Sequence, residues 1–314
     1  MSTVVFLGAG FSRLAGVPLA RQLFDTEPVV DRISRQRLVN RVRRGWLTWH
    51  QDTAASPEQY LAYLEHSAGR EWRDAVWYVG LIVALRMGRV EAVGGRTTIT
   101  RHNINRTSGV AAQEDFWTSV FRRAENVSVI TTNFDILAER GLRNQPRPRM
   151  HRPGFHYGLG AEYLEGGGYP SYAHIHRIAV RGAVPLFKLH GSVSWSIRKG
   201  KIVRYHDCRP AIRGDAMIVA PIVEKRVPAY LGAVWDAALK ALATARTVLI
   251  VGYSLPSYDQ RVVGLLRGIS DRASVHVFDP DAMLVSRYQN TLQRAIVRHK
   301  GLPEGTAEIG AILS

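Results

Sequence analysis

Short apolar runs alternate with helical patterns along much of the chain. The runs are rich in β-branched residues and end in glycine or polar residues, as buried strands do. We expect strands at 3–8, 127–131, 183–189, 216–221, 247–252 and 274–279. We expect helices from about Pro18 and at about 135–142, 228–245, 258–270 and 281–295. Apolar strands that alternate with helices predict an α/β fold with a Rossmann-like parallel sheet and helices on both faces.

Residues 29–125 show a different pattern, in which apolar positions recur every three to four residues. This spacing predicts helices in PEQYLAYLEHSAG, EWRDAVWYVGLIVALRM and QEDFWTSVFRRAE, with a loop at 88–98. We therefore predict a core formed by 1–28 and 126–314, and a helical module, 29–125, inserted between its first two strands. Tryptophans of the module are expected to pack in its core or at an interface: Trp46, Trp49, Trp72 and Trp77.

Two further segments have recognisable patterns. SWSIRKGKIVRY at 194–205 predicts a small hairpin that turns at Lys199 and Gly200. Residues 143–182 are rich in Gly, Pro, His and Tyr, which favours a long ordered loop or lid.

Composition is typical of a globular protein, with 46% hydrophobic and 22% charged residues. The longest apolar run, at 76–85, is too short to span a bilayer, and the N-terminus lacks a secretory pattern. The single cysteine, Cys208, excludes an internal disulfide and a multi-cysteine zinc ribbon. We therefore expect a cytoplasmic protein without a membrane association.

The net charge of +16 favours partners that carry phosphate or acidic groups. The densest basic cluster is at 31–44, where Arg37, Arg41 and Arg44 share one helical face. Aromatic residues are not interleaved there as they are in proteins that stack bases. A solvated face, or one that meets an acidic partner chain, is therefore favoured over a nucleic-acid site.

Small or polar residues follow four of the expected strands, in GAGFS at 8–12, TTNFD at 131–135, KLHGS at 188–192 and VGYSLPSYD at 251–259. Because the carboxyl ends of parallel strands meet at one edge of a sheet, these residues are expected to converge there. Taken singly, each motif is also compatible with an ordinary turn, since Asn and Asp stabilise turns and a lone histidine is more often structural.

The glycines of GAGFS allow backbone N–H groups to approach an anionic ligand. They do not complete the usual dinucleotide fingerprint, because Arg13 occupies the position of its third glycine. The second core strand begins only near residue 127, so no acidic residue follows at the customary spacing. A dehydrogenase that transfers hydride is therefore a poor fit.

The four motifs, in this order, resemble the signatures of the sirtuin superfamily. PIVEK at 221–225 and the stretch 234–259 are similar to a bacterial sirtuin-like branch that includes the NAD-hydrolysing effectors of anti-phage defence. The resemblance implies that Asn133 orients the ribose or a water and that His190 is the general base. Further residues are implied to bind the dinucleotide: Gly8, Ala9, Gly10, Phe11, Ser12, Thr132, Asp135, Gly252, Ser254 and Asp279. Among them, Asp135 is implied to hold the nicotinamide carboxamide.

The resemblance implies NAD+ as substrate, cleaved between nicotinamide and ribose, with no metal required. Sirtuin deacylases carry a four-cysteine zinc module between the HG and GxS motifs, where this chain has only Cys208. Water is then the simplest acceptor, which predicts an NAD+ glycohydrolase that depletes NAD+ in anti-phage defence. A protein ADP-ribosyltransferase or deacylase, and a subunit that binds NAD or ADP-ribose without turnover, remain alternatives. The resemblance also implies a homo-oligomer or a partner defence protein.

Two other groups of residues were weighed as sites. The histidines His151, His156, His174 and His176 lack a recognisable metal-site spacing, so a loop that covers the substrate is preferred for them. Arg147, Arg149 and Arg152 are interpreted as a solvated loop rather than a phosphate site.

Overall fold

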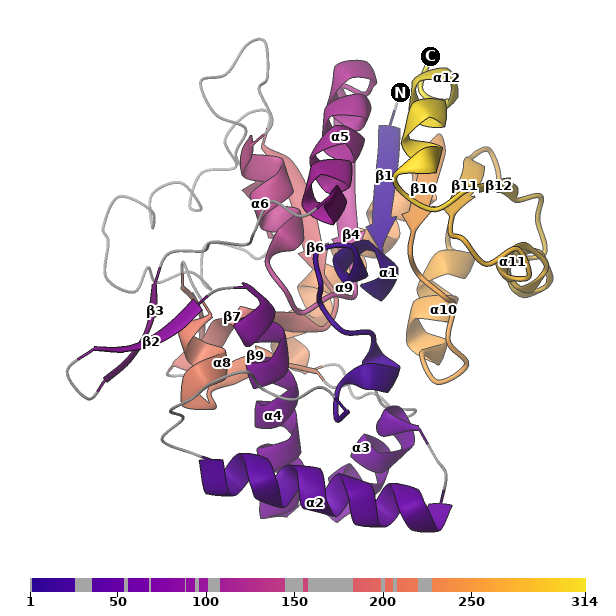
Figure 1. The fold of residues 1–314 in the computed structure, drawn as a ribbon. Helices are drawn as coiled ribbons and strands as arrows, with labels where there is room; N and C mark the ends of the chain where they lie inside the picture. Colours follow the sequence, from indigo (N-terminus) through magenta and orange to yellow (C-terminus); the bar gives the residue numbers. More distant parts are fainter. Residues whose placement is uncertain are drawn as a thin grey trace.

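A seven-stranded parallel sheet forms the centre of the computed structural model (Figure 1). The structure describes residues 2–25, 36–53, 56–67, 69–87, 89–93, 96–100, 108–144, 155–157, 183–198, 201–205, 208–219 and 228–314. The strand order is β12 (Val297–His299), β11 (Ser274–Phe278), β10 (Thr247–Val251), β1 (Ser2–Leu7), β4 (Asn126–Thr131), β6 (Val184–Lys188) and β5 (Phe155–His156). The predicted Rossmann-like fold is thereby confirmed.

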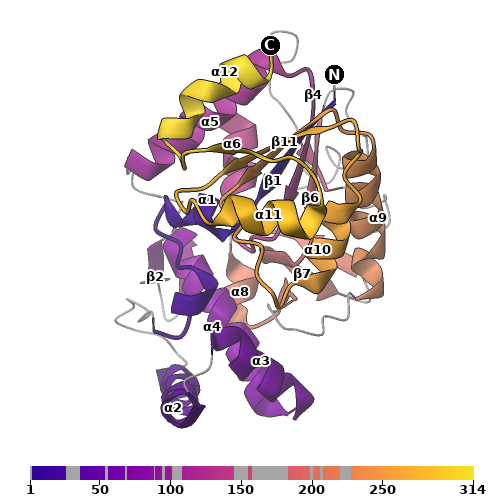
Figure 2. The ribbon, with the colours of Figure 1, turned by 90° about the vertical axis from the view of Figure 1, so that its right-hand side faces the viewer.

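The central strands are buried because helices cover both faces of the sheet. Strand β10 is buried at every position, and β1 is buried from Thr3 onward. Figure 2 shows one layer with α5 (Ser108–Arg123), α6 (Leu137–Asn144) and α12 (Ile309–Ile312), and the other with α9 (Ala229–Ala243) and α10 (Gln260–Arg267). Helix α11 (Leu284–Leu292) packs against α10. Enclosure on both faces explains why these strands are continuous apolar runs rather than alternating ones.

Three helices extend beyond the carboxyl edge of the sheet, as Figure 1 shows: α2 (Gln36–Thr53), α3 (Pro57–His66) and α4 (Arg70–Met87). Buried aromatic rings join them to the segment after β1, because Phe24 stacks on Trp46 and Tyr78 and meets the edge of Tyr60. Trp46 and Trp77 are both buried, as expected. Helix α5 instead packs against α6, α12 and η3 (Glu304–Glu308). The division at residues 29 and 125 stays a prediction.

A small antiparallel sheet adjoins the core and includes the predicted hairpin, formed by β7 (Gly191–Arg198) and β8 (Lys201–Arg204). Its third strand, β9 (Ala216–Ile218), pairs with β7. The expectation of a core strand at 216–221 was therefore wrong. An apolar run does not reveal its partner, and β9 pairs for only three residues.

The loop expected at 88–98 is instead a hairpin of β2 (Arg89–Val93) and β3 (Arg96–Thr100). Val and Thr around a Gly-Gly pair are typical of a hairpin, so the signal was present in the sequence. The helix expected from Pro18 is only the short η1 (Ala20–Gln22), whereas α1 (Ala9–Arg13) begins directly after β1. The short elements β5, β12, α8 (Arg209–Arg213) and α12 were not predicted. In the described part of the chain no helix combines the length and apolar character needed to cross a bilayer.

Candidate functional site

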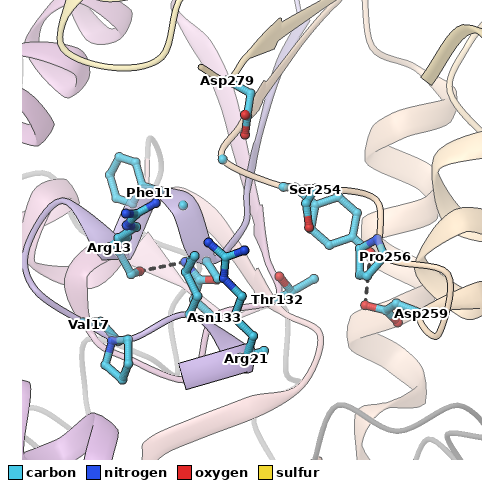
Figure 3. A pocket seen from close by; sticks show the side chains of 18 of the residues that line it. Phe11, Arg13, Val17, Arg21, Thr132, Asn133, Ser254, Pro256, Asp259 and Asp279 are labelled. Atoms are coloured by element: carbon cyan, nitrogen blue, oxygen red, sulfur yellow. Dashed lines mark hydrogen bonds between the residues drawn. The ribbon is translucent and has the colours of Figure 1, made fainter. Parts of the chain in front are cut away.

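A cavity of about 1070 Å³ lies at the carboxyl edge of the sheet, where the four motifs meet. Its volume is slightly larger than the roughly 300–1,000 Å³ typical of small-molecule sites. All the predicted site residues except Gly8 line it: Ala9, Gly10, Phe11, Ser12, Thr132, Asn133, Asp135, His190, Gly252, Ser254 and Asp279. Figure 3 shows Phe11, Arg13 and Asn133 on one side of the cavity and Ser254, Pro256 and Asp259 on the other. The expected convergence of the strand ends therefore occurs.

The glycines of the first and last motifs pack backbone against backbone. Gly252 has φ +63°, and a Cβ atom there would lie 2.4 Å from the Phe11 nitrogen. A Cβ atom on Gly8 or Gly10 would lie 2.5 or 2.7 Å from atoms of the 252–253 turn. The N–H groups of Gly8 and Gly10 donate to the carbonyl oxygens of Val251 and Gly252 at 3.0 and 2.8 Å. These two amides therefore join the turns to each other, and anion binding by the GAGFS motif stays a prediction.

Asn133 lines the cavity, and its amide nitrogen is held by the first motif. Its Nδ2 donates to the Gly8 carbonyl oxygen and to Ser12 Oγ, both at 2.8 Å. Because a carbonyl oxygen only accepts, the bond to Gly8 fixes which end of the amide is nitrogen. Oδ1 is the half of the amide that remains for a ligand. The turn is also stabilised by Thr131, whose Oγ1 accepts from the Asn133 N–H at 3.0 Å.

Asp135 lines the cavity but is buried, with only 3% of its surface exposed. Its Oδ2 accepts from Ser12 Oγ at 2.6 Å, and its Oδ1 accepts from the Leu137 N–H at 2.9 Å. Burial raises the pKa of the Asp135 carboxyl, while the Lys188 charge and the Ser12 hydroxyl act in the opposite direction. Both oxygens thus hold the α1 and α6 turns together. Contact with a carboxamide stays a prediction for this residue.

A fully buried lysine connects the second and third motifs. Lys188, at the end of β6, contacts Glu139 Oε1 at 3.1 Å and donates to the Asp135 carbonyl oxygen. Tyr157 donates its hydroxyl to the same Glu139 oxygen at 3.1 Å. Buried charges are tolerated when they are paired and hydrogen-bonded, as here. The network fixes the TTNFD turn relative to β6, the strand that precedes His190.

His190 lies opposite a second buried carboxylate. Its Nε2 is 3.3 Å from Asp259 Oδ2, and the Tyr253 hydroxyl is 3.1 Å from the same oxygen. The three side chains are 3%, 4% and 4% exposed. Asp259 belongs to the fourth motif, VGYSLPSYD, but was not predicted as a site residue. An acidic residue in a strand-end motif was a usable signal. Tyr253 was missed because a tyrosine that follows a buried strand is usually part of the hydrophobic core.

Charged side chains surround the opening. Arg13, Arg21 and Arg287 are exposed and line the cavity, and Arg287 donates to the Ser254 carbonyl oxygen at 3.0 Å. Asp279 is half-buried, and burial raises the pKa of its carboxyl. Sequence reasoning did not assign the two arginines after GAGFS to the site. Their signal was proximity to the first motif.

Helix α3 also reaches the cavity, through Ser56, Glu58 and Gln59. Glu58 is 4% exposed and hydrogen-bonds Tyr258 in the loop before α10. Burial, and then Glu58, raise the pKa of the Tyr258 hydroxyl. A segment predicted as part of a separate module therefore forms part of the cavity wall.

Several residues considered in the sequence analysis lie outside the described ranges: PIVEK at 221–225, His151, His174, His176, Arg147, Arg149 and Arg152. His156 is described, in β5. Within the described ranges no group of three or more His, Cys, Asp or Glu side chains is arranged to hold a metal. Arg37, Arg41 and Arg44 are exposed on α2.

Comparison with solved structures gives similarities to Sir2 proteins. A Sir2 homologue in complex with NAD is 14% identical with a TM-score of 0.48, covering 99% of this chain and 88% of that chain. A mutant Sir2 homologue with 2′-O-acetyl ADP ribose is 14% identical with a TM-score of 0.46, covering 99% and 90%. A Sir2 bound to a propionylated peptide is 11% identical with a TM-score of 0.42, covering 99% and 92%.

A search of curated proteins found no match. The profile of the family described as SIR2-like domain matches residues 127–300, which is more than half of the chain. The match spans three of the four strand-end motifs, including Asn133, His190 and Asp259. This chain belongs to the SIR2-like domain family.

Proposed function

We propose that the protein is an NAD+ glycohydrolase, which cleaves the nicotinamide–ribose bond and releases nicotinamide and ADP-ribose. The observation that carries the proposal is the convergence of Asn133 and His190 on one cavity large enough for a dinucleotide. Arg13 and Arg21 at the opening supply positive charge for a pyrophosphate. The solved Sir2 complex that contains NAD agrees with this choice of substrate.

The proposed reaction needs few groups from the protein. The bond between C1′ of the ribose and the pyridinium nitrogen breaks, and its electron pair neutralises the ring, so the leaving group needs no acid. The transition state has oxocarbenium character, as in glycoside hydrolysis. Asn133 Oδ1 orients the ribose or the attacking water, and His190 accepts the proton as the water oxygen bonds to C1′. Such general-base assistance contributes roughly 10²–10⁴-fold.

Water is the acceptor in this proposal. The only cysteine, Cys208, is buried, so the chain lacks the four-cysteine module of sirtuin deacylases. We place the activity in NAD+ depletion during anti-phage defence, with assembly into an oligomer or with a partner protein as its control. This assignment rests on the sequence resemblance. It is tested by expressing the wild type and a His190→Ala variant in bacteria challenged with phage, with cellular NAD+ as the readout.

The enzymatic proposal is tested by incubating the purified chain with NAD+ and following nicotinamide release. Asn133→Ala and His190→Ala are each expected to lower the rate by about 10²-fold or more. Matched controls are Asn290→Ala and His66→Ala, which alter exposed residues on α11 and α3. Wild-type rates in both site variants would refute the assignment of these two residues.

A further inference from the structure

Asp259 occupies a helix N-cap without capping the helix. It immediately precedes α10, where an aspartate normally accepts a hydrogen bond from a backbone N–H of the first turn. No such side-chain bond forms here. This carboxylate therefore forgoes a common local stabilisation. Its Oδ2 is instead shared by His190 Nε2 and the Tyr253 hydroxyl.

The chemistry of the two partners fixes the direction of both bonds. Burial raises the pKa of the Tyr253 hydroxyl well above its usual value, and the Asp259 charge adds to this effect. The phenol is therefore protonated near neutral pH and donates to Asp259 Oδ2. With Asp259 ionised, its carboxylate only accepts, and His190 then carries a proton on Nε2, directed at Asp259, and a lone pair on Nδ1.

We propose that Asp259 is the positioning residue for His190, holding the imidazole in the Nε2–H tautomer and in a fixed orientation for proton transfer. Tyr253 in turn holds the carboxylate. The proposal deepens the proposed function, on which its catalytic meaning rests. Asp259 stabilises the imidazolium that forms when the histidine accepts a proton, in the way that a buried aspartate serves the histidine of a serine-protease triad.

The tautomer is measured first, because it requires no turnover. Nitrogen-15 chemical shifts of histidine-labelled, ligand-free protein distinguish a protonated from an unprotonated ring nitrogen, and the His190 signals are those lost in His190→Gln. We expect the Nε2–H form in the wild type and a loss of that preference in Asp259→Asn. A wild-type His190 with its proton on Nδ1, or an unchanged tautomer in Asp259→Asn, would overturn the proposal.

Steady-state kinetics supply the second measurement. Asp259→Asn is expected to lower kcat by about 10²–10⁴-fold, within the range that general-base catalysis contributes, with little change in KM. Tyr253→Phe leaves the carboxylate in place and should reduce kcat less. The matched control is Asp271→Asn, which alters an exposed aspartate before the amino end of β11. A rise in KM at unchanged kcat would assign Asp259 to substrate binding and refute the positioning role.

The two measurements separate the two proposals. A wild type that leaves NAD+ intact refutes the glycohydrolase. The tautomer of His190 still shows whether Asp259 positions the imidazole. Thermal unfolding of each variant shows whether it is folded. If Asp259→Asn does not fold, the wild-type tautomer and the kcat of Tyr253→Phe test the proposal in its place.

Discussion

Removing the buried Lys188 should destabilise the protein strongly. The lysine is fully buried, and its ammonium lies between Glu139 and the Asp135 carbonyl oxygen. Lys188→Met leaves Glu139, which is 3% exposed, with a charge and only the Tyr157 hydroxyl as a described side-chain partner. Breaking a buried pair from one side costs about 3–5 kcal/mol, because an uncompensated charge remains.

The double variant Lys188→Met/Glu139→Gln removes both charges. Glutamine keeps an oxygen that accepts from Tyr157, so the double variant should be more stable than the sum of the single effects implies. We expect a coupling energy of about 1–3 kcal/mol, in the range for residues of one network. Lys240→Met, at an exposed position on α9, is the control and should change stability by less than about 0.5 kcal/mol.

Urea unfolding followed by circular dichroism provides the free energies, with an unchanged m-value as evidence of a comparable unfolding transition. Nicotinamide release from the same variants shows whether the TTNFD turn keeps its geometry. Additive effects of the two single changes, or a Lys188→Met variant whose free energy of unfolding is within about 1 kcal/mol of the wild type, would refute the role of the network.

Two further changes test the packing of the site and of the sheet edge. Gly252→Ala introduces a side chain at φ +63°, which costs about 1–2 kcal/mol before its contact with the Phe11 nitrogen is counted. Gly264→Ala, in open space on α10, should stabilise by about 0.5–1 kcal/mol, and equal stability of the two variants in urea would contradict the close approach of the turns. Burial, with a smaller effect of His299, lowers the pKa of His276 from 6.5 to about 4. The unfolded chain therefore takes up this proton first as pH falls from 6.5 to 4, and the free energy of unfolding should decrease over that interval. His276→Gln should reduce this slope in unfolding curves measured at several pH values, and an unchanged slope would contradict the assignment.

The sequence was sufficient for the parallel sheet and for the convergence of four strand ends, because both follow from apolar runs and from their order along the chain. The sequence was insufficient where the structure of a segment depends on which other segment it pairs with. The run at 216–221 has the composition of a core strand, yet β9 pairs with β7 outside the central sheet. Likewise, GAGFS suggests amides that face an anion, whereas pairing with the 252–253 turn occupies those of Gly8 and Gly10.

Contacts between side chains that are distant in the sequence could not be predicted either. Asp259 and His190 are 69 residues apart, and no local pattern indicates that their side chains meet. The same holds for Glu58, which lies in a helix predicted as part of a separate module and borders the cavity beside Tyr258. Lys188 looked like part of a strand-end motif, and only its burial against Glu139 gives it a structural role.

The product balance of the purified chain with NAD+ labelled in its adenine tests the proposed glycohydrolase reaction itself. We expect nicotinamide and free labelled ADP-ribose to appear in equal amounts, and both to disappear in His190→Ala. Label bound covalently to protein would show transfer to a side chain instead of water. NAD+ that stays intact while it binds tightly would show a binding protein, and either result would contradict an NAD+ glycohydrolase.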